Sequence, residues 1–441
     1  MEIKLIGHSC VLFKDIVRGQ AILCDPWLQG RVFNNGWTQS PMSVLDEADL
    51  QSVTHLYISH EHPDHLHFPT LKSFSEAFKR KVTVIFQKLH DDKVPRALAS
   101  IGYHNVRVLQ HLERLNINDG LSVHIYQHRH LDSALLVRAD GKFLLNLNDV
   151  ELTYQEGVRL REKFGPCDVL LSQFSIAGSE GIEDKLRSDS DVVIAKLISQ
   201  AQGLGAKIVI PFASFVYFCM PDNFFINQYA NTVLEVKSRL KQAAIRCHLL
   251  FPGSEISDSE PVRKQDDERK FIEFYKNRSL QLFQSEPSVS LDTIKLTIEA
   301  RMLKWRSSYP SLIIKRLGSI VIHVSDLNRN VKLDFVACRA AETTNNALMT
   351  VNSQPLFFAF SEPFGIQTLG VSGRYRLKSI TPQWKAVRIV SSLHNAGIAL
   401  TIRGLCSPNF LSWVWSRRSN VWGNVIQQFQ RFAPAAKKDV L

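Results

Sequence analysis

Residues 54–72, THLYISHEHPDHLHFPTLK, decide the fold. An apolar strand ends in this stretch and is followed by four potential metal ligands in the pattern HxHxDH: His60, His62, Asp64 and His65. In an extended loop, the two-residue spacing puts His60 and His62 on one side, where both imidazoles can reach one ion. Pro63 turns the chain so that Asp64 and His65 can face a second ion. We therefore predict a centre of one or two metal ions at the end of this strand.

The alternative for this loop is a solvated, histidine-rich turn that binds nothing. Burying His or Asp without a partner costs free energy, and a charged turn seldom places four ligand-type side chains at this spacing. We therefore favour the metal centre. Asp64 is in addition a candidate to orient a metal-activated water or to accept its proton.

The sequence around this loop is typical of an α/β domain. Over the first ~250 residues, short β-branched runs alternate with turns and with helical patterns near 69–79, 155–164, 188–203 and 223–243. Tight turns at Asn118-Asp119-Gly120 and Ala139-Asp140-Gly141 favour hairpins over a purely parallel sheet. We expect two sheets packed face to face with helices outside, an αββα sandwich.

Length and charge indicate a second domain. A chain of 441 residues exceeds what one hydrophobic core usually organises, roughly 250 to 300 residues. We expect a metal-binding domain at 1–255, a linker with a connector helix at 256–285, and a C-terminal α+β domain at 286–441. Residues 301–441 hold 19 Lys and Arg against 5 Asp and Glu, whereas the first 300 residues hold 34 against 37. The C-terminal domain is therefore basic, which is typical either of an acidic partner or of a generally basic surface.

Two segments of the C-terminal domain carry further expectations. The stretch GVSGRYRLKSI, residues 370–380, has a hairpin-like pattern, and a closing helix is expected around 420–432. The run LSWVWSRRSNVWGNVIQQF mixes three tryptophans with Arg417 and Arg418. Such a segment can contact a membrane surface or an acidic ligand, with core packing as the plainer alternative. Nothing in it is typical of a nucleic-acid-binding motif, so we do not expect nucleic acid as a partner.

The cysteines and the N-terminus exclude several classes of protein. Seven cysteines are scattered singly, without a CxxC pair or a CxH followed by CxxH, which argues against a disulfide framework, a zinc ribbon and a Rieske centre. The start of the sequence lacks the pattern of a secretory signal, and no apolar stretch is long enough to span a bilayer. A cytoplasmic location is the resulting expectation.

HxHxDH after an apolar strand resembles the metallo-β-lactamase superfamily. GHSCVLF and AILCDPWL resemble the opening of its ascorbate-6-phosphate lactonase-like and N-acylphosphatidylethanolamine phospholipase D-like branch. DPWLQGRVFNNGW, KFLLNLNDV, VLLSQFSIAG and IVIPFASFVYF are most similar to the metallo-β-lactamase-like region of CMP-N-acetylneuraminate hydroxylases. The likeness runs from about residue 5 to 255.

The resemblance implies further ligands. His128 would be the third histidine of the first metal, with His130 as the alternative, and Asp149 would be the carboxylate that bridges both metals. Asp149, like Asp64, would then be a catalytic candidate. His8 and Asp25 would line the pocket or hold hydrogen bonds to metal ligands, with structural roles as the alternative.

Two features depart from the family pattern. Met220 stands where the hydroxylase-like sequences would carry a late histidine; His248 is a substitute candidate, and a structural role for it is the alternative. The hydroxylases also need a Rieske centre, which the cysteine pattern does not provide. Because the late histidine is missing, the second metal is expected to be bound more weakly, to have different ligands or to be absent.

These observations give three hypotheses. The first is a hydrolase in which one or two zinc ions activate a water toward an ester, lactone, amide or phosphodiester of a small, anionic substrate. The second is an oxygenase that uses iron and a separate redox partner on a nucleotide-sugar or a related metabolite. The third is a non-catalytic binding protein. Iron or manganese is the alternative to zinc.

Overall fold

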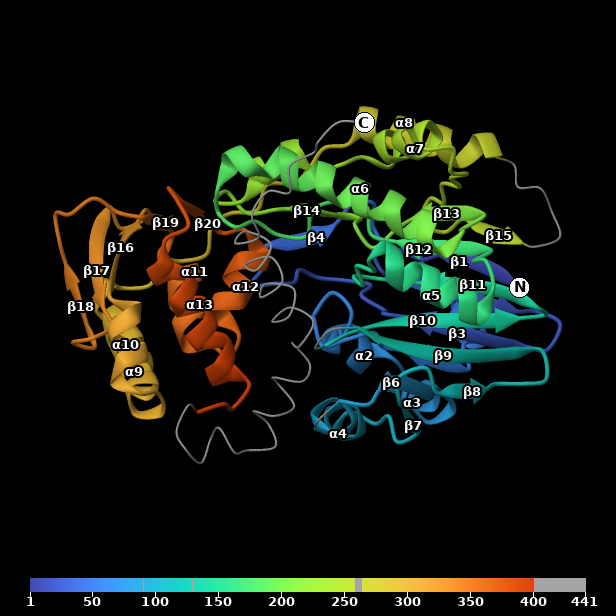
Figure 1. The fold of residues 1–441 in the computed structure, drawn as a ribbon, viewed down its shortest axis with the longest axis horizontal. Coiled ribbons are helices and arrows are strands. Elements are labelled where there is room, and N and C mark those ends of the chain that lie inside the picture. Colours follow the sequence, from blue (N-terminus) through green and yellow to red (C-terminus); the bar gives the residue numbers. More distant parts are fainter. Residues whose placement is uncertain (90, 129–130, 258–263, 400–441) are drawn as a thin grey trace, which may run out of the picture.

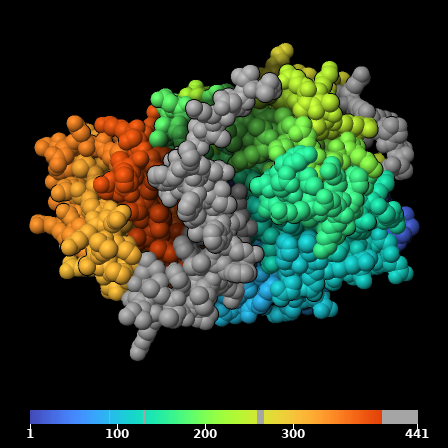
Figure 2. Space-filling view, viewed as in Figure 1, coloured from blue at the N-terminus to red at the C-terminus, as the bar shows by residue number. Residues whose placement is uncertain are grey.

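The computed structural model describes residues 1–89, 91–128, 131–257 and 264–399. They form a larger N-terminal domain and a smaller C-terminal domain, which lie side by side (Figures 1 and 2). The C-terminal domain is the orange and red body on the left in Figure 2. No helix in the described ranges is long and apolar enough to cross a membrane.

The N-terminal domain stacks two sheets. The first has seven strands in the order β15 (Glu255–Ser257), β1 (Glu2–Leu5), β2 (Val11–Asp15), β3 (Gln20–Cys24), β5 (His55–Tyr57), β6 (Thr83–Gln87) and β7 (Val106–Leu109). The second has six, in the order β13 (Ile208–Pro211), β12 (Val169–Ser172), β11 (Lys142–Asn146), β10 (Asp132–Ala139), β9 (Leu121–His128) and β8 (Arg114–Asn116). The short strands β4 (Trp37–Gln39) and β14 (Val216–Phe218) pair with each other.

Both sheets mix parallel and antiparallel pairs. The strands β8, β9, β10 and β11 pair antiparallel in sequence, and the turn between β10 and β11 uses Asp140 and Gly141 with φ of 47° and 80°. Positive φ at both central residues gives a two-residue hairpin its twist. By contrast, β3, β5, β6 and β7 are parallel, as are β11, β12 and β13. The expected hairpins are therefore confirmed. The parallel strands are connected through helices.

Helices cover the outer face of each sheet (Figure 1). One layer holds α1 (Glu47–Ser52), α2 (Phe68–Ser73), α3 (Glu76–Lys81) and α4 (Lys93–Ser100), and the other holds α5 (Tyr154–Phe164), α6 (Leu186–Leu204), α7 (Val233–Gln242) and α8 (Lys264–Asn277). Two 3₁₀ turns precede helices of this layer: η1 (Glu183–Lys185) comes before α6, and η2 (Phe224–Tyr229) comes before α7. The predicted αββα sandwich is confirmed.

The alternation of side chains along β3 shows how the layers are held together. Ile22 and Cys24 are buried in the core between the two sheets, whereas Ala21 and Leu23 are buried under the first helix layer. Successive side chains of a strand point to opposite faces, and here both faces are apolar. A strand that is covered on both sides reads as a continuous apolar run, as AILC does.

The C-terminal domain packs helices on a five-stranded sheet. The strand order is β18 (Arg339–Glu342), β17 (Arg329–Asp334), β16 (Ser319–Val324), β19 (Met349–Val351) and β20 (Tyr375–Leu377). Its helices are α9 (Leu291–Ser308), α10 (Ser311–Leu317), α11 (Ser353–Ser361), α12 (Gly365–Ser372) and α13 (Pro382–Asn395). This domain has its own apolar core, built from residues between Ile294 and Ile398.

One sequence-based expectation in this domain is wrong. Residues 370–380 do not form a hairpin, because the first of them complete α12 and only Tyr375–Leu377 form a strand, which pairs with β19. Ile366 and Leu369, three positions apart, bury one face of α12 in the domain core. The expected helix at 420–432 and the tryptophan-rich run at 411–429 lie outside the described residues.

A buried arginine joins the two domains. Arg374 precedes β20 and is only 1% exposed. Its Nη2 donates to Glu286 Oε2 at 2.7 Å, its Nε donates to Asp222 Oδ1 at 3.0 Å, and its Nη1 donates to the backbone oxygen of Asn34 at 2.9 Å. Asp222 and Asn34 belong to the N-terminal domain, so this cluster holds the C-terminal domain against one end of the sandwich.

Candidate metal centre

The candidate ligands gather at one edge of the sandwich because several strands end there. Asp25 follows β3 directly, the loop of residues 59–65 follows β5, and Asp149 lies three residues after β11. The strands β3 and β5 are parallel neighbours, so their carboxyl ends lie together. Ligands in open α/β sheets bind beyond the carboxyl ends of such strands. We call residues 59–65 the metal loop.

Ser59 and Asp25 set the orientation of two histidines. Ser59 donates from its backbone N and its Oγ to the two carboxylate oxygens of Asp25, at 2.8 and 2.7 Å. Nδ1 of His65 lies 2.9 Å from Asp25 Oδ2, and Nδ1 of His60 lies 2.9 Å from Ser59 Oγ. In the neutral tautomer that carries its proton on Nδ1, each ring donates to these oxygens and leaves its Nε2 available to a metal ion. Metal-binding histidines are held by their second nitrogen in this way.

The Nε2 atoms face the other candidate ligands. His60 Nε2 lies 2.8 Å from His62 Nδ1. Asp149 Oδ2 lies 3.7 Å from His60 Nε2 and 3.3 Å from His65 Nε2. Two nitrogens at ~2.0–2.1 Å from one tetrahedral zinc are ~3.3 Å apart, so these separations are of the size that a shared ion requires.

Asp64 completes a second group with His8. His8 Nε2 lies 3.1 Å from Asp64 Oδ2, and His65 Nε2 lies 3.4 Å from the same oxygen. Ligand-type atoms of His8, Asp64 and His65 lie within 4.8 Å of one another, as do those of His60, His65 and Asp149. The two groups share His65, so the two candidate positions are adjacent.

Unpaired polar atoms at the centre are consistent with a metal ion. Asp64 Oδ1 and His8 Nδ1 are buried, and neither has a hydrogen-bond partner within the described ranges. A buried carboxylate oxygen without a partner costs free energy unless a cation or a ligand satisfies it. The residues present, imidazoles and carboxylates, are also those that zinc, iron and manganese accept. The donor set therefore fits a metal ion.

The electrostatics of the centre keep its carboxylates ionised. Burial opposes charge on Asp64, but His65 and His8 outweigh it and hold the pKa of Asp64 well below its usual value. The pKa of Asp149 is lowered too, since His65 and His60 outweigh its burial. Burial, together with His65 and His62, depresses the pKa of His60, which favours the neutral form that can bind metal.

The pKa of His65 shifts in the opposite direction to that of His60. Burial lowers its pKa, but Asp64, Asp149 and Asp25 outweigh burial and raise the pKa well above its ordinary value. Without a metal, a proton on His65 therefore partly neutralises three carboxylates. A bound cation would replace that proton, so metal uptake at this centre is expected to release protons.

Three other residues singled out in the sequence, His128, His248 and Met220, lie outside these two groups. His128, at the end of β9, is buried, and its Nε2 lies 3.9 Å from Glu156 Oε1. His248 lies beside β13, where its backbone N donates to Val209 O. Met220 packs with Tyr217 and Cys219 and accepts from Arg31 Nη1 through its sulfur at 3.4 Å. His130 lies outside the described residues.

Sequence reasoning missed Ser59 and the contacts of the C-terminal domain. Ser59 is fully buried and links Asp25 to His60; the only signal for it was a polar residue at the end of an apolar strand. Trp27 is also fully buried, with its ring 5.5 Å from that of His8, so it packs against the centre as part of an apolar cluster.

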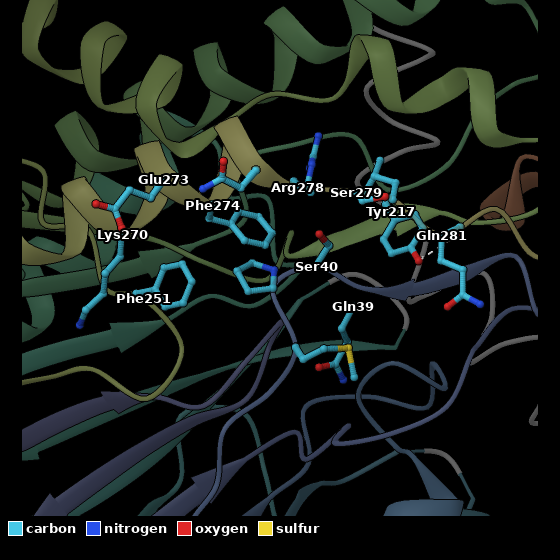
Figure 3. Close-up of a pocket in the computed structure, with 14 residues that line it drawn as sticks. Gln39, Ser40, Tyr217, Phe251, Lys270, Glu273, Phe274, Arg278, Ser279 and Gln281 are labelled. Atoms are coloured by element: carbon cyan, nitrogen blue, oxygen red, sulfur yellow. Dashed lines mark hydrogen bonds between the residues drawn. The ribbon is translucent and has the colours of Figure 1, made fainter.

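Two pockets differ in their relation to the metal loop. The larger, about 670 Å³, lies between residues 39–42 and the end of α8; Tyr217 OH donates there to Gln281 O (Figure 3). None of the residues in the two candidate ligand groups lines it. The smaller pocket, about 360 Å³, is lined by His62 and its neighbours Glu61 and Pro63, and by α12 and α13. Of these two pockets in the described part of the chain, the smaller is therefore the one that borders the metal loop.

Comparisons with known proteins agree with this geometry. Residues 2–185 match the family model described as a β-lactamase superfamily domain. A cytidine monophosphate-N-acetylneuraminic acid hydroxylase from Danio rerio is 24% identical over 356 residues, which cover 74% of this chain. The chain spans 58% of the length of that relative.

Two solved structures were matched to part of this chain. A diiron β-hydroxylase from Streptomyces venezuelae is 16% identical with a TM-score of 0.42, and the match covers 58% of this chain and 53% of that one. An isothiocyanate hydrolase from Delia radicum gut bacteria is 17% identical with a TM-score of 0.41, covering 58% and 99%. Residues 2–185, which match the β-lactamase superfamily domain, carry most of the strands of the αββα sandwich and the HxHxDH loop.

Proposed function

We propose that this chain is a metal-dependent hydrolase acting on an ester, lactone, amide or phosphodiester of a small molecule. The observation that carries the proposal is the convergence of ligand-type atoms from His60, His62, Asp64, His65 and Asp149 at one strand edge. Structural ion pairs seldom leave a buried carboxylate oxygen without a partner, as Asp64 Oδ1 is left among the described residues.

The residues divide into those that hold a metal and those that orient them. His60 and His62 would hold one ion, Asp64 and His65 a second, and Asp149 would lie between them. Asp25 and Ser59 would fix the imidazole rings, and His8 would fix Asp64. A bound ion would supply Lewis acidity and lower the pKa of a water toward neutrality. Zinc is the metal that we propose first, with iron or manganese as alternatives.

Asp64 and Asp149 have different roles in this proposal. The pKa values of Asp64 and Asp149 are both lowered by the neighbouring histidines, so the two carboxylates differ in exposure and not in the direction of the pKa shift. Asp149 has a side chain that is 23% exposed, against 4% for Asp64. We therefore assign the orientation of the attacking water to Asp64 and assign to Asp149 the transfer of its proton toward the opening of the site.

The first test is metal content. The full chain is purified without oxygen and without added metal, and its metals are measured by elemental analysis beside a His62→Ala variant. Zinc or manganese near one or two per chain, lost in the variant, would support hydrolysis and justify screening lactones, amides and phosphodiesters. A folded chain without bound metal, before and after zinc is supplied, would overturn the proposal.

A second function follows from the hydroxylase likeness, which covers 74% of the chain. In it the same ligands would hold iron, and the reaction would consume oxygen with electrons from a separate redox partner. Oxygen uptake with a chemical reductant separates the two proposals. Two irons per chain and substrate-dependent oxygen uptake would favour the oxygenase, whereas turnover without oxygen would favour the hydrolase.

A further inference from the structure

His62 is held differently from the other two histidines of the metal loop. Nδ1 of His60 and Nδ1 of His65 each contact an oxygen of Ser59 or Asp25, which fixes the ring. The only hydrogen bond of the His62 ring within the described ranges joins its Nδ1 to His60 Nε2 at 2.8 Å, at the position proposed for a metal ion. No oxygen atom of the described chain therefore orients the His62 ring, so its orientation depends on the side chains packed against it.

Phe33 is the side chain that packs against the ring of His62. The two ring centroids lie 5.9 Å apart with the ring planes at 72°, an edge-to-face arrangement. The other ring close to His62 is that of His60, which is itself a candidate ligand. Phe33 is only 6% exposed, and it also packs against Trp37, with ring centroids 4.7 Å apart. A displaced Phe33 would therefore leave the His62 ring free to turn away from the metal position.

Phe33 lies in a loop with an unfavourable backbone conformation. Residues 33–36, here called the 33–36 loop, turn the chain between two residues that exchange both of their backbone hydrogen bonds. Phe33, Asn34 and Asn35 have φ of 52°, 53° and 58°, so three successive residues are left-handed. Asn tolerates this region, but a bulky residue rarely adopts it, and left-handed residues normally occur singly. Contacts from the surrounding structure must therefore hold the loop in this conformation.

The C-terminal domain supplies several of these contacts. The side-chain amides of Asn34 and Gln354 donate to each other reciprocally, at 3.1 and 3.0 Å, and Arg374 Nη1 donates to Asn34 O at 2.9 Å. In Figure 1, α12 lies on the side of the C-terminal domain that faces the sandwich. A Cβ added at Gly36 would lie 2.8 Å from Ser372 Cβ at the end of α12, so only glycine allows this close approach. Residues from three places in the C-terminal domain therefore hold the 33–36 loop.

The contacts of the two domains divide along the loop. Within the N-terminal domain, Asn223 Nδ2 and Cys219 N both donate to Gly36 O, at 2.9 and 3.1 Å, so the end of the loop is fixed without the second domain. By contrast, the hydrogen bonds found for the Asn34 side chain within the described ranges all join it to Gln354. Asn34 directly follows Phe33, so the start of the loop depends on the C-terminal domain.

We propose that the C-terminal domain positions His62 through Phe33, so that docking of this domain and metal binding at His62 strengthen each other. Phe33 is a positioning residue in this inference and takes no part in the chemistry. The inference rests on the proposed function for the metal ion itself, and it gives that centre a means of regulation. A change that separates Gln354 from Asn34 should weaken metal binding. A bound ion should in turn tighten the contact between the domains, because coupling of two binding equilibria is reciprocal.

Zinc affinity tests the coupling. It is measured with the full chain by competition with a chelator. Phe33→Leu and Gln354→Leu should each weaken zinc binding by about 10-fold or more, which is the usual effect of losing a contact that orients a metal ligand.

Two matched variants serve as controls. Phe218→Leu changes the same apolar cluster as Phe33→Leu, but at a ring that packs against Trp37. Tyr375→Phe removes a different hydrogen bond between the domains, the one from Tyr375 OH to Ser179 O. Zinc affinity should be unchanged in both. The thermal unfolding midpoint is measured for every variant, so that a general loss of stability is recognised.

A double variant tests whether Gln354 acts through Phe33. If it does, the chain with both Phe33→Leu and Gln354→Leu should bind zinc no more weakly than the Phe33→Leu chain, because the second change then removes nothing further. Two independent structural defects would instead have additive effects. Additive effects, an unchanged zinc affinity in Phe33→Leu, or an equal loss of affinity in the control variants would overturn the inference.

The NMR signal of the His62 ring separates this inference from the proposed function. It is recorded on the metal-free chain with isotope-labelled histidine and is assigned by comparison with His62→Ala. Gln354→Leu should shift this signal, although Gln354 contacts the 33–36 loop rather than His62, and Tyr375→Phe should leave it unchanged.

The two readouts together distinguish the possible failures. If the chain takes up no zinc, the proposed function fails and the coupling to metal fails with it, whereas a shifted His62 signal in Gln354→Leu would still support the positioning of His62 by the C-terminal domain. If zinc binds, and Gln354→Leu keeps both the parent affinity and the parent signal, the metal centre stands and this inference fails.

Discussion

The protein has two buried clusters of charged and polar residues, and they differ in how their polar atoms are satisfied. Around Arg374, the guanidinium donates to Glu286, Asp222 and Asn34. At the metal loop, imidazoles and carboxylates face one another, and Asp64 Oδ1 has no partner within the described ranges. The first cluster is complete with protein atoms alone and the second is not. Buried charge that is fully paired indicates a structural role, and buried charge that lacks partners indicates a ligand.

The largest expected effect is a loss of bound metal and of turnover, and it follows from a substitution at the metal loop. His60→Ala should remove at least one metal ion per chain and lower turnover by about 10³-fold or more, because metal activation is worth several kcal/mol. The matched control is His55→Ala, a histidine of β5 that bonds Thr54 and belongs to neither ligand group. Elemental analysis and turnover are the measurements. Equal metal content in both variants would contradict the role of His60 as a metal ligand.

The next effect is on stability. Arg374→Met should lower the free energy of unfolding by about 3–5 kcal/mol, because it leaves the partly buried carboxylates of Asp222 and Glu286, 12% and 18% exposed, without their cation. Metal content should be unchanged. Arg376→Met, at the exposed arginine two residues away that pairs with Glu183, should change the free energy by less than about 1 kcal/mol.

Urea denaturation measures both changes. Neutralising the two acids in the Arg374→Met chain, with Asp222→Asn and Glu286→Gln, should restore much of the lost stability. An Arg374→Met protein as stable as the parent would show that the cluster is not structural.

A smaller effect is expected at Asp25, which contacts the candidate ligand His65 and is not itself proposed to bind the metal. Asp25→Asn should weaken metal binding by about 10- to 100-fold, because the carboxylate that receives Nδ1–H of His65 becomes a weaker acceptor. Asn tolerates the left-handed φ of 41° found at this position, so the backbone should be preserved. Competition with a chelator measures the affinity. An unchanged affinity with intact fold would mean that Asp25 is structural only.

The smallest expected effect concerns pH and the cluster around Arg374. Burial raises the pKa of Glu286, but its contacts with Arg374 outweigh burial and lower the pKa below the ordinary value of 4.5. A carboxyl whose pKa is lowered by folding stabilises the fold above its unfolded pKa, and this stabilisation is lost as the pH falls through the folded pKa. The difference in unfolding free energy between the parent and Glu286→Gln should therefore be larger at pH 7 than at pH 3.5. Urea denaturation at both pH values tests this, and a difference that grows at low pH would contradict it.

Several features of the site could be read from the sequence because they are local. Four of the candidate ligands lie within six residues, so the chain itself holds them near one another. Strand alternation and turn residues predicted the sandwich and its hairpins for the same reason. The hairpin expected at 370–380 failed because a short segment with Gly and charged residues does not reveal that Ile366 and Leu369 bury a helical face just before it.

The sequence by itself determined the αββα class and the HxHxDH loop, since both depend on spacings of a few residues. Only the tertiary structure decided which residues distant in sequence contact the HxHxDH loop. It brought His8 to Asp64, placed Ser59 between Asp25 and His60, and left His248 outside both ligand groups. It also placed Asn34 against Gln354 of the C-terminal domain. These contacts depend on how sheets and domains pack, and packing joins residues whose separation along the chain carries no periodic signal.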